Sequence, residues 1–517
     1  MLEKISLKNF KAFSSLEDLD IKPITILSGA NSCGKSSLLQ SILLLKQTLE
    51  SQSLNQSLLL NGRFVRLGTF ENVIFHKKSE SAVELKFSFL IRKKDFPSIY
   101  KRRTFALSIF LRELFQHGKS FSVQPGKEVE YAISYRVVLK TKENKLKKYQ
   151  LKPVLVEEIE LITKVMDSEK NVLSKSTVEA NHIHGNSYRL EWANVKSRVD
   201  KSLENDPENI DKNKEDEGEE VVKILFSNFF PTVIASDSEE AKKGRASYRD
   251  AYIVLRRASD FLQNILNSYS YIGPLREEPS RRYIYEDEII EIGNKGENAA
   301  YIYLSEGEEY ISDTYLYNPT TDSFEKSDEK LKLSEAVRRW LDLMNIKNFS
   351  PEPQQEIIYL NLNASPLDST RVSIADVGFG VSQVFPIVLE GLRMPRGSTL
   401  LLEQPEIHLH PNLQMDMADY FISLALSGKR VIVETHSDHI INRLVRRIVE
   451  DETSQLSELV KIYFVGLTES GSVCDEVSVD DTLGIVNWPD NFFDQVAKEQ
   501  QKIMLAGLKK RKSSRQA

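Results

Sequence analysis

The stretch GANSCGKS at residues 29–36 constrains the fold of this 517-residue chain more than any other segment. It has the form G-x-x-x-x-G-K-S, follows the run ITIL at 24–27, and opens an apolar helical pattern. The glycines let backbone N–H groups turn inward onto phosphate oxygens, and Lys35 adds a point charge for the β and γ phosphates. The Ser36 hydroxyl can ligate Mg²⁺. The sequence therefore predicts a site for ATP and Mg²⁺ between a strand and a long helix.

Composition excludes several classes of protein. The chain is 41% hydrophobic and 28% charged, which is ordinary for a globular protein. Because no apolar run approaches the ~20 residues that span a bilayer, and Glu3 and Lys4 interrupt the start, we expect neither a membrane span nor a secretory signal. Cys33 and Cys474 form no C-x-x-C pair, which favours a reducing cytoplasm. The net charge of −6 gives no general attraction to nucleic acid.

A second apolar run leads to a carboxylate. The leucines at 400–402 predict a buried strand that delivers Glu403 at its carboxyl end, where α/β proteins bind their ligands. A carboxylate there can hold Mg²⁺ directly or through water, so Ser36 and Glu403 are the predicted metal ligands. The alternative is an acid that merely starts a helix after a core strand.

A third run, VIV at 431–433, ends in the residues ETH. His436 would then follow a strand beside two nucleotide motifs, a position from which an imidazole can sense the γ-phosphate. A purely structural histidine is the alternative.

The order of the patterns divides the chain. From about residue 355 strands and helices alternate, which predicts a parallel α/β sheet. The segments 81–93 and 130–142 alternate apolar and polar residues as half-buried strands do, and 248–271 has helical spacing. The predicted organisation is a nucleotide-binding head split between 1–76 and 355–445, an insertion at 77–268, a connecting segment at 269–354, and a C-terminal region with a basic tail at 446–517.

Taken together, these motifs resemble the ABC-type ATPase heads of the structural-maintenance-of-chromosomes (SMC) and OLD-nuclease kind. In those proteins an NFKxF strand pair precedes the phosphate loop, and the signature, Walker B strand and switch histidine follow a long insertion. This chain has NFKAF at 9–13, GFGVSQ at 378–383, LLLEQPE at 400–406 and VIVETH at 431–436. YIGPLREEPSRRY and NWPDNFF resemble the marks of a bacterial ATPase family of unknown function, and ATPase subunits of anti-phage systems are built on similar heads.

The resemblance implies an α/β fold: an ABC-type P-loop ATPase head with a mixed α+β insertion between its N-terminal and C-terminal lobes. It also implies that two copies close on two ATP·Mg, with the signature of one copy capping the γ-phosphate of the other. The signature reads GFGVSQ where such heads read LSGGQ. The implied nucleotide-binding residues are Lys11, Asn31, Ser32, Cys33, Gly34, Lys35, Ser36, Ser37, Gly378, Gly380 and Ser382, and the implied catalytic residues are Glu403, Gln404, Glu406 and His436.

Gln404 departs from the family pattern. ABC heads read Asp-Glu where this chain reads Glu403-Gln404, and an amide orients water but cannot accept its proton. Loss of a general base costs about 10²–10⁴-fold in rate. The hypothesis is a long-lived ATP-bound dimer that hydrolyses slowly, or one that recruits Glu406 as the base. The alternative is phosphoryl transfer that depends on positioning and charge neutralisation and needs no strong base.

The expected partners follow from the same resemblance. We expect a homodimer or higher oligomer whose closure controls a separate protein effector, such as a nuclease, in anti-phage defence. The rival is a nucleotide-gated scaffold or nucleic-acid sensor with negligible ATP turnover. Basic runs at 92–103 and 140–152 keep nucleic acid open as a partner. A P-loop kinase is disfavoured because it explains neither GFGVSQ nor the strand that ends at His436.

Overall fold

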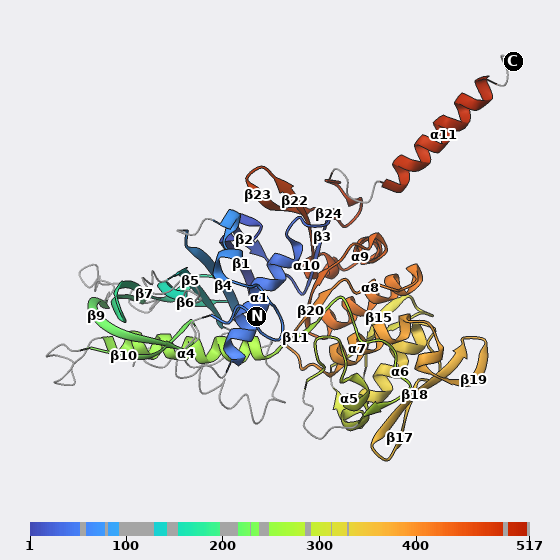
Figure 1. Cartoon of the computed structure of the whole chain (residues 1–517), viewed down its shortest axis with the longest axis horizontal. Helices are drawn as coiled ribbons and strands as arrows, with labels where there is room; N and C mark the ends of the chain where they lie inside the picture. The colour runs from blue at the N-terminus through green and yellow to red at the C-terminus, as the bar shows by residue number, and fades with distance from the viewer. Residues whose placement is uncertain are drawn as a thin grey trace, which may run out of the picture.

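Figure 1 shows the computed structural model of the chain, coloured from the amino to the carboxyl terminus. Two large sheets, a smaller one and the helices around them make up the body, and a single helix projects from it near the carboxyl terminus. The structure describes residues 1–51, 58–77, 81–92, 129–141, 154–196, 216–227, 229–236, 248–284, 291–311, 313–327, 330–489 and 495–513.

A six-stranded sheet carries the phosphate loop, in the order β11-β20-β21-β3-β22-β23. Neighbouring strands are parallel from β11 to β22, and β23 pairs antiparallel with β22 at the edge. The inner strands are short apolar runs buried on both faces, as is typical of parallel sheets. The strands are β3 (Ile24–Gly29), β11 (Tyr269–Ile272), β20 (Thr399–Glu403), β21 (Arg430–Glu434), β22 (Val460–Thr468) and β23 (Gly471–Val477).

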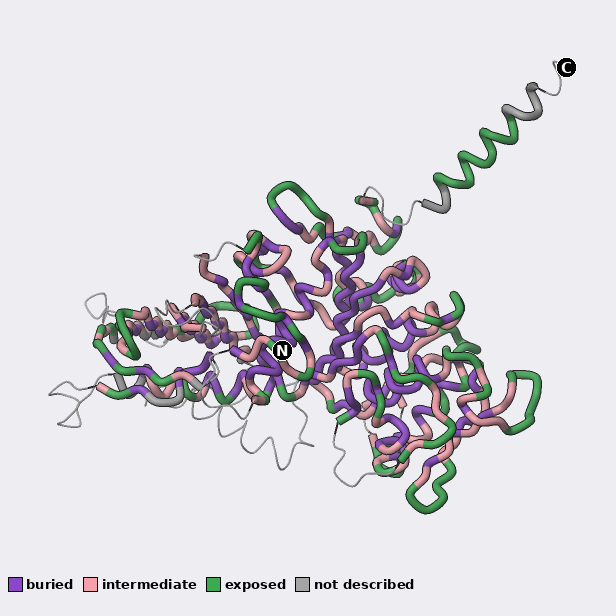
Figure 2. The backbone as a smooth tube through the Cα atoms, in the orientation of Figure 1, coloured by how far each residue is buried: buried purple, intermediate pink, exposed green. Residues whose placement is uncertain are grey.

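Each face of this sheet packs against its own hydrophobic core. Leu401 and Ile432 belong to the core that contains the apolar faces of α1 and α4. Leu402 and Val433, one residue further along the same strands, belong to the core formed with α7, α8 and α9. Figure 2 shows these strands buried. The helices are α1 (Lys35–Glu50), α4 (Tyr248–Asn267), α7 (Gly380–Arg393), α8 (Pro411–Leu426) and α9 (Asp438–Glu450).

A nine-stranded antiparallel sheet lies against α1 and α4, in the order β10-β9-β8-β7-β6-β5-β4-β1-β2. Because β4 pairs with β1, the insertion continues the sheet begun by the N-terminal strands. The strands predicted at 81–93 and 130–142 are confirmed as β4 and β5. The helix predicted at 248–271 is confirmed as α4, but it ends at Asn267, and the last residues of the predicted range belong to β11. The strands are β1 (Leu2–Phe10), β2 (Phe13–Asp20), β4 (Val83–Arg92), β5 (Val129–Thr141), β6 (Val154–Asp167), β7 (Val172–His184), β8 (Ser187–Lys196), β9 (Asp216–Ser227) and β10 (Phe230–Ala235).

A third, smaller sheet corrects one prediction. The strand expected from about residue 355 is β18, and it pairs antiparallel with β17, β19 and β12, so it does not belong to the parallel sheet. Its alternation of buried and half-buried residues is the pattern of such an antiparallel sheet. The elements of this region are β12 (Tyr283–Ile284), α5 (Ala299–Glu306), β13 (Tyr310–Ile311), β14 (Tyr315–Asn318), β15 (Ser323–Lys326), β16 (Leu331–Lys332), α6 (Leu333–Leu343), β17 (Ser350–Gln354), β18 (Ile357–Ser365) and β19 (Asp368–Ser373).

The segment after α9 returns to the phosphate-loop sheet, because β22 pairs directly with β3. The helix α11 then projects away from the body, and its described side chains are exposed (Figures 1 and 2). Across the described residues, no helix combines the length and apolar character needed to cross a bilayer. The last elements are α10 (Gln455–Leu459), β24 (Val479–Asp480), β25 (Gly484–Ile485) and α11 (Gln495–Ser513).

The predicted α/β class is confirmed: helices cover both faces of the sheet that carries the phosphate loop, and a mixed segment of strands β4 to β10 and helix α4 stands between the N-terminal and C-terminal parts of the chain. The five segment boundaries stay a prediction. The pairing of β4 with β1 shows that strands on either side of residue 76 share one sheet.

Candidate functional site

The loop between β3 and α1 is shaped by two glycines. Gly29 has φ 140° and Gly34 has φ 102°, values that side chains rarely permit. A Cβ at Gly29 would lie 2.2 Å from the Val465 carbonyl oxygen, and one at Gly34 would lie 2.7 Å from Ser472 Oγ. The first turn of α1 begins directly after this loop, so its unpaired N–H groups face the space that the loop encloses.

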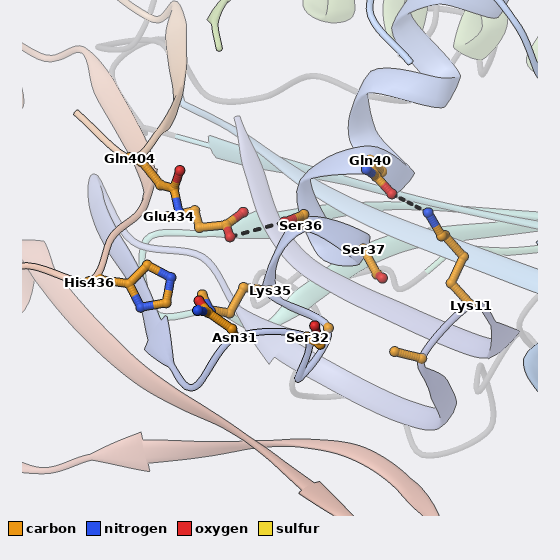
Figure 3. A pocket seen from close by; sticks show the side chains of 12 residues that line it. Lys11, Asn31, Ser32, Lys35, Ser36, Ser37, Gln40, Gln404, Glu434 and His436 are labelled. Atoms are coloured by element: carbon orange, nitrogen blue, oxygen red, sulfur yellow. Dashed lines mark hydrogen bonds between the residues drawn. The ribbon is translucent and has the colours of Figure 1, made fainter. Parts of the chain in front are cut away.

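A cavity of about 430 Å³ lies between this loop and the carboxyl ends of β20 and β21 (Figure 3). Its lining is mainly polar and combines two lysines with hydroxyl, amide, carboxylate and imidazole groups. The residues that line it are Lys11, Ala12, Asn31, Ser32, Gly34, Lys35, Ser36, Ser37, Gln40, Gln404, Glu434 and His436.

Lys35 is held inside its own loop. The side chain is 3% exposed, and its Nζ donates hydrogen bonds to the carbonyl oxygens of Gly29 (3.1 Å) and Ala30 (2.7 Å). The positive charge therefore lies among the loop amides at the start of α1. A cation and converging N–H groups in this arrangement form a binding site for phosphate oxygens.

Ser36 contacts a carboxylate at the end of β21, the strand that pairs with β3. Its Oγ donates a 2.9 Å hydrogen bond to Glu434 Oε1, and Figure 3 shows the Glu434 side chain reaching from β21 toward α1. Glu434 is 5% exposed, and this burial raises the pKa of its carboxyl group, while Ser36 and the charge of Lys35 act in the opposite direction. The sequence analysis placed this glutamate at a strand end but not in the site. The sequence signal for Glu434 is that it follows an apolar run just as Glu403 does, and the two residues are register partners in adjacent strands.

Glu403 does not line the cavity. Its Oε1 accepts a 3.0 Å hydrogen bond from the Tyr271 hydroxyl at the end of β11. Burial, with a smaller contribution from the Glu434 charge, raises the pKa of Glu403 to about 7. This carboxylate therefore takes up a proton near neutral pH.

Gln404 lines the cavity beside Glu434 (Figure 3). It adopts φ 46°, a left-handed conformation that costs a non-glycine residue about 1–2 kcal/mol. Its N–H donates to the Glu434 carbonyl oxygen at 2.7 Å, and its own carbonyl accepts from Arg276 at 3.2 Å. These two bonds hold the strained backbone and direct an amide toward the cavity.

Glu406 orients the segment that contains the predicted switch histidine. One carboxylate oxygen accepts from the Thr435 hydroxyl and the other from the His436 backbone N–H, each at 2.7 Å. The imidazole of His436 lines the cavity, and burial together with the Lys35 charge lowers its pKa. The ring is therefore neutral at pH 7 and can exchange hydrogen bonds with a ligand.

Lys11 reaches the cavity from the turn between β1 and β2. Its Nζ donates to Gln40 Oε1 on α1, and burial lowers the pKa of its amino group. Gln40 was missed by the sequence analysis. It stands four residues after Ser36 on the same helix, a spacing that places both on one helix face.

Several predicted site residues lie elsewhere. Cys33 is 2% exposed and does not line the cavity, and its Sγ lies 2.8 Å from the Ala30 carbonyl oxygen. Gly378 and Gly380 stand at the start of α7 and do not line the cavity of their own chain. Ser382, in the first turn of α7, is 6% exposed and donates to the Phe379 carbonyl oxygen. Gly378 is exposed, and in the described structure no atom lies within 4 Å of where its Cβ would stand.

The cavity offers the donors that a magnesium nucleotide needs. Lys35 and the loop amides suit phosphate, and a hydroxyl with a carboxylate suits Mg²⁺, which prefers oxygen ligands. Among the described residues, Glu434 Oε2 is one of the buried polar atoms without a hydrogen-bond partner. A carboxylate oxygen in this state fits a site for a cation.

Residues 1–441 match the family model described as an AAA ATPase domain. The chain belongs to the AAA ATPase domain family. Membership of this family agrees with the P-loop geometry and makes the chain an ATP-binding ATPase. No curated protein sequence matches the chain.

Solved structures similar to this AAA ATPase domain protein include SMC heads. An SMC head bound to the C-winged helix domain of ScpA is 12% identical, with 93% of this chain and 99% of that chain covered and a TM-score of 0.39. The SMC head domain from Thermotoga maritima is 10% identical, with coverages of 92% and 99% and a TM-score of 0.34. An Smc head with an extended coiled coil, bound to the C-terminal domain of ScpA derived from Pyrococcus furiosus, is 10% identical, with coverages of 97% and 99% and a TM-score of 0.33.

Proposed function

We propose that the chain binds ATP·Mg in the P-loop cavity, hydrolyses it slowly, and uses the bound state to control a partner protein. The observation that carries the proposal is the cavity itself, because Lys35 and Ser36 line it together with Gln404 and His436. In this proposal Lys35 neutralises the β and γ phosphates, and the backbone N–H groups of 31–37 bind their oxygens. Lys11 adds a second positive charge at the cavity wall.

Slow hydrolysis follows from the groups that face the cavity. Gln404 can orient a water molecule but cannot take its proton. Glu406 already accepts hydrogen bonds at both carboxylate oxygens, so its structural work is to hold Thr435 and His436. His436, with its lowered pKa, is a weak base that can hydrogen-bond the γ-phosphate. A supporting test measures single-turnover hydrolysis before and after Gln404→Glu.

We further propose that two copies close on the nucleotide through the start of α7. Gly378 leaves open space at the surface there, and Phe379 beside it is 48% exposed. Ser382 is turned into its own helix, so its hydroxyl has to change rotamer to meet a phosphate of another copy. Molecular mass measured by light scattering tests this: ATP·Mg should double the mass of the wild type, and an unchanged mass would contradict dimerisation.

The partner and pathway rest on the resemblance of sequence motifs. An anti-phage ATPase whose partner is a nuclease is the form proposed. The basic runs at 92–103 and 140–152 lie almost wholly outside the described residues, so they add nothing to the choice between protein and nucleic acid. Co-expression with the neighbouring gene product, followed by nuclease assays with and without ATP, tests the effector role.

The second candidate is a nucleotide-gated scaffold or nucleic-acid sensor without turnover. The amide of Gln404 in the cavity is the observation that favours it. Steady-state ATPase assays with and without DNA distinguish the two. Measurable phosphate release supports the slow ATPase, whereas ATP-dependent assembly without release supports the scaffold.

A further inference from the structure

Two glutamates end adjacent parallel strands, but they face different surroundings. Glu403 of β20 and Glu434 of β21 are register partners. Glu403 accepts a hydrogen bond from Tyr271 and does not line the cavity, whereas Glu434 does. Among the described residues of that lining, Glu434 is the only one with a carboxylate. The strand that the sequence motif marks for metal binding is therefore not the strand that presents its acid to the cavity.

The two oxygens of Glu434 are in different states. Oε1 accepts the hydrogen bond from Ser36 Oγ at 2.9 Å. Oε2 is buried and has no hydrogen-bond partner among the described residues. A buried carboxylate oxygen left in this way is costly unless a cation or a donor reaches it. The charge of Lys35 acts to lower the pKa of Glu434, but the Lys35 Nζ donates its hydrogen bonds to the Gly29 and Ala30 carbonyl oxygens.

We infer that Glu434 and Ser36 together form the divalent-cation site of the nucleotide cavity, with Glu434 as the carboxylate ligand. The inference deepens the proposed function and rests on it. The hydroxyl and the carboxylate already touch, so one ion can reach an oxygen of each without a rearrangement of the sheet. Glu403 then acts as a positioning residue, one strand away and bonded to Tyr271.

A purely structural role for Glu434 predicts a different environment for its two carboxylate oxygens. If its work were only to hold Ser36, one oxygen would suffice, and the second would be expected in solvent or paired. Instead the side chain is 5% exposed, and Oε2 is buried without a hydrogen-bond partner among the described residues. A structural role also predicts that loss of the carboxylate affects nucleotide binding equally with and without a divalent cation.

The test measures the affinity for a non-hydrolysable ATP analogue by calorimetry, in Mg²⁺ and in EDTA. The dissociation constant in EDTA divided by that in Mg²⁺ reports how strongly the protein's site for the cation supports binding. In Glu434→Gln this ratio should fall about tenfold or more, the scale typical of disturbed metal sites. In EDTA the same variant should bind the analogue as tightly as the wild type or more tightly, because one negative charge facing the phosphates is gone.

Glu403→Gln is the matched control, because it makes the same change on the neighbouring strand. Its EDTA-to-Mg²⁺ ratio of dissociation constants should change less than that of Glu434→Gln. In Glu434→Gln the new amide oxygen can still accept the Ser36 hydrogen bond, and thermal unfolding of both variants checks that the fold is kept.

The outcomes separate the inference from the function on which it rests. An unchanged ratio in Glu434→Gln, or a larger fall of the ratio in Glu403→Gln, overturns the inference about Glu434. Binding of the analogue by the wild type would still support the proposed function in that case. Failure of the wild type to bind the analogue at all overturns the proposed function.

Discussion

Arg276 Nε donates a 3.0 Å hydrogen bond to Gln383 Oε1, and so joins the segment after β11 to helix α7. The same guanidinium donates to the carbonyl oxygens of Gln404 and Pro405, at 3.2 and 3.3 Å. One buried side chain therefore connects the helix proposed to meet a second copy with the loop that shapes the cavity. If two copies close as proposed, a movement of α7 would reach Gln404 through this side chain.

Substitution of Arg276 should destabilise the fold. Arg276→Ala removes the donor to Gln383 Oε1 and to the Pro405 carbonyl oxygen, each loss at a cost of about 1–3 kcal/mol, so the free energy of unfolding should fall by at least about 2 kcal/mol. Arg281→Ala is the control, because its ion pair with Asp376 joins side chains that are 68% and 38% exposed. Removing that pair should cost about 0–1 kcal/mol. Equal losses in urea unfolding of the two variants would contradict the role assigned to Arg276.

Gly34→Ala should distort the backbone of the phosphate loop. Its φ of 102° and the 2.7 Å approach to Ser472 Oγ leave no room for a methyl group. The strain alone is about 1–2 kcal/mol, and the displaced amides should weaken ATP binding measured by calorimetry. Gly507→Ala, where the added Cβ meets nothing within 4 Å in exposed α11, should leave ATP binding intact. Wild-type affinity in Gly34→Ala would show that the loop does not hold the phosphates.

Gln404→Glu should accelerate hydrolysis if the missing base limits the rate. The added carboxylate can accept the proton of the attacking water, and the gain should be about 10²-fold or more in single-turnover rate. Gln404→Ala is the matched control, because it removes the amide without adding a base. An unchanged rate in the glutamate variant would favour phosphoryl transfer governed by positioning and charge.

Glu403 should make the stability of the protein depend on pH. Its pKa is about 7 in the folded state, above the ordinary 4.5, so the folded chain binds the extra proton between these values. Stability from this group should therefore be highest at low pH and fall as pH rises from about 4.5 to 7, by up to about 3 kcal/mol. Glu403→Gln should flatten this part of the unfolding profile between pH 5 and pH 8. A variant profile parallel to that of the wild type would show that the raised pKa is not real.

The sequence predicted the parts of the site that local pattern determines. The loop at 29–36 and the strand ends at Glu403 and Glu434 follow from glycine spacing and apolar runs, and β3, β20 and β21 end at Gly29, Glu403 and Glu434. Whether the side chain of an acid at a strand end lines the cavity depends on neighbours that are distant in sequence. Tyr271 holds Glu403, and Ser36 holds Glu434 across 398 positions of the chain. Pairing of β18 with β17 and β19 was missed for a related reason, since a strand–helix alternation does not specify which sheet a strand joins.

Calorimetric titration of ATP in Mg²⁺ into the wild type, Lys35→Ala and Lys8→Ala is the most direct test of the account. Lys35 is buried among the loop amides, whereas Lys8 is an exposed lysine on β1. Binding by the wild type and Lys8→Ala, with affinity at least about tenfold weaker in Lys35→Ala, is the predicted result. No binding by the wild type, or equal binding by all three proteins, would contradict the claim that this cavity holds ATP.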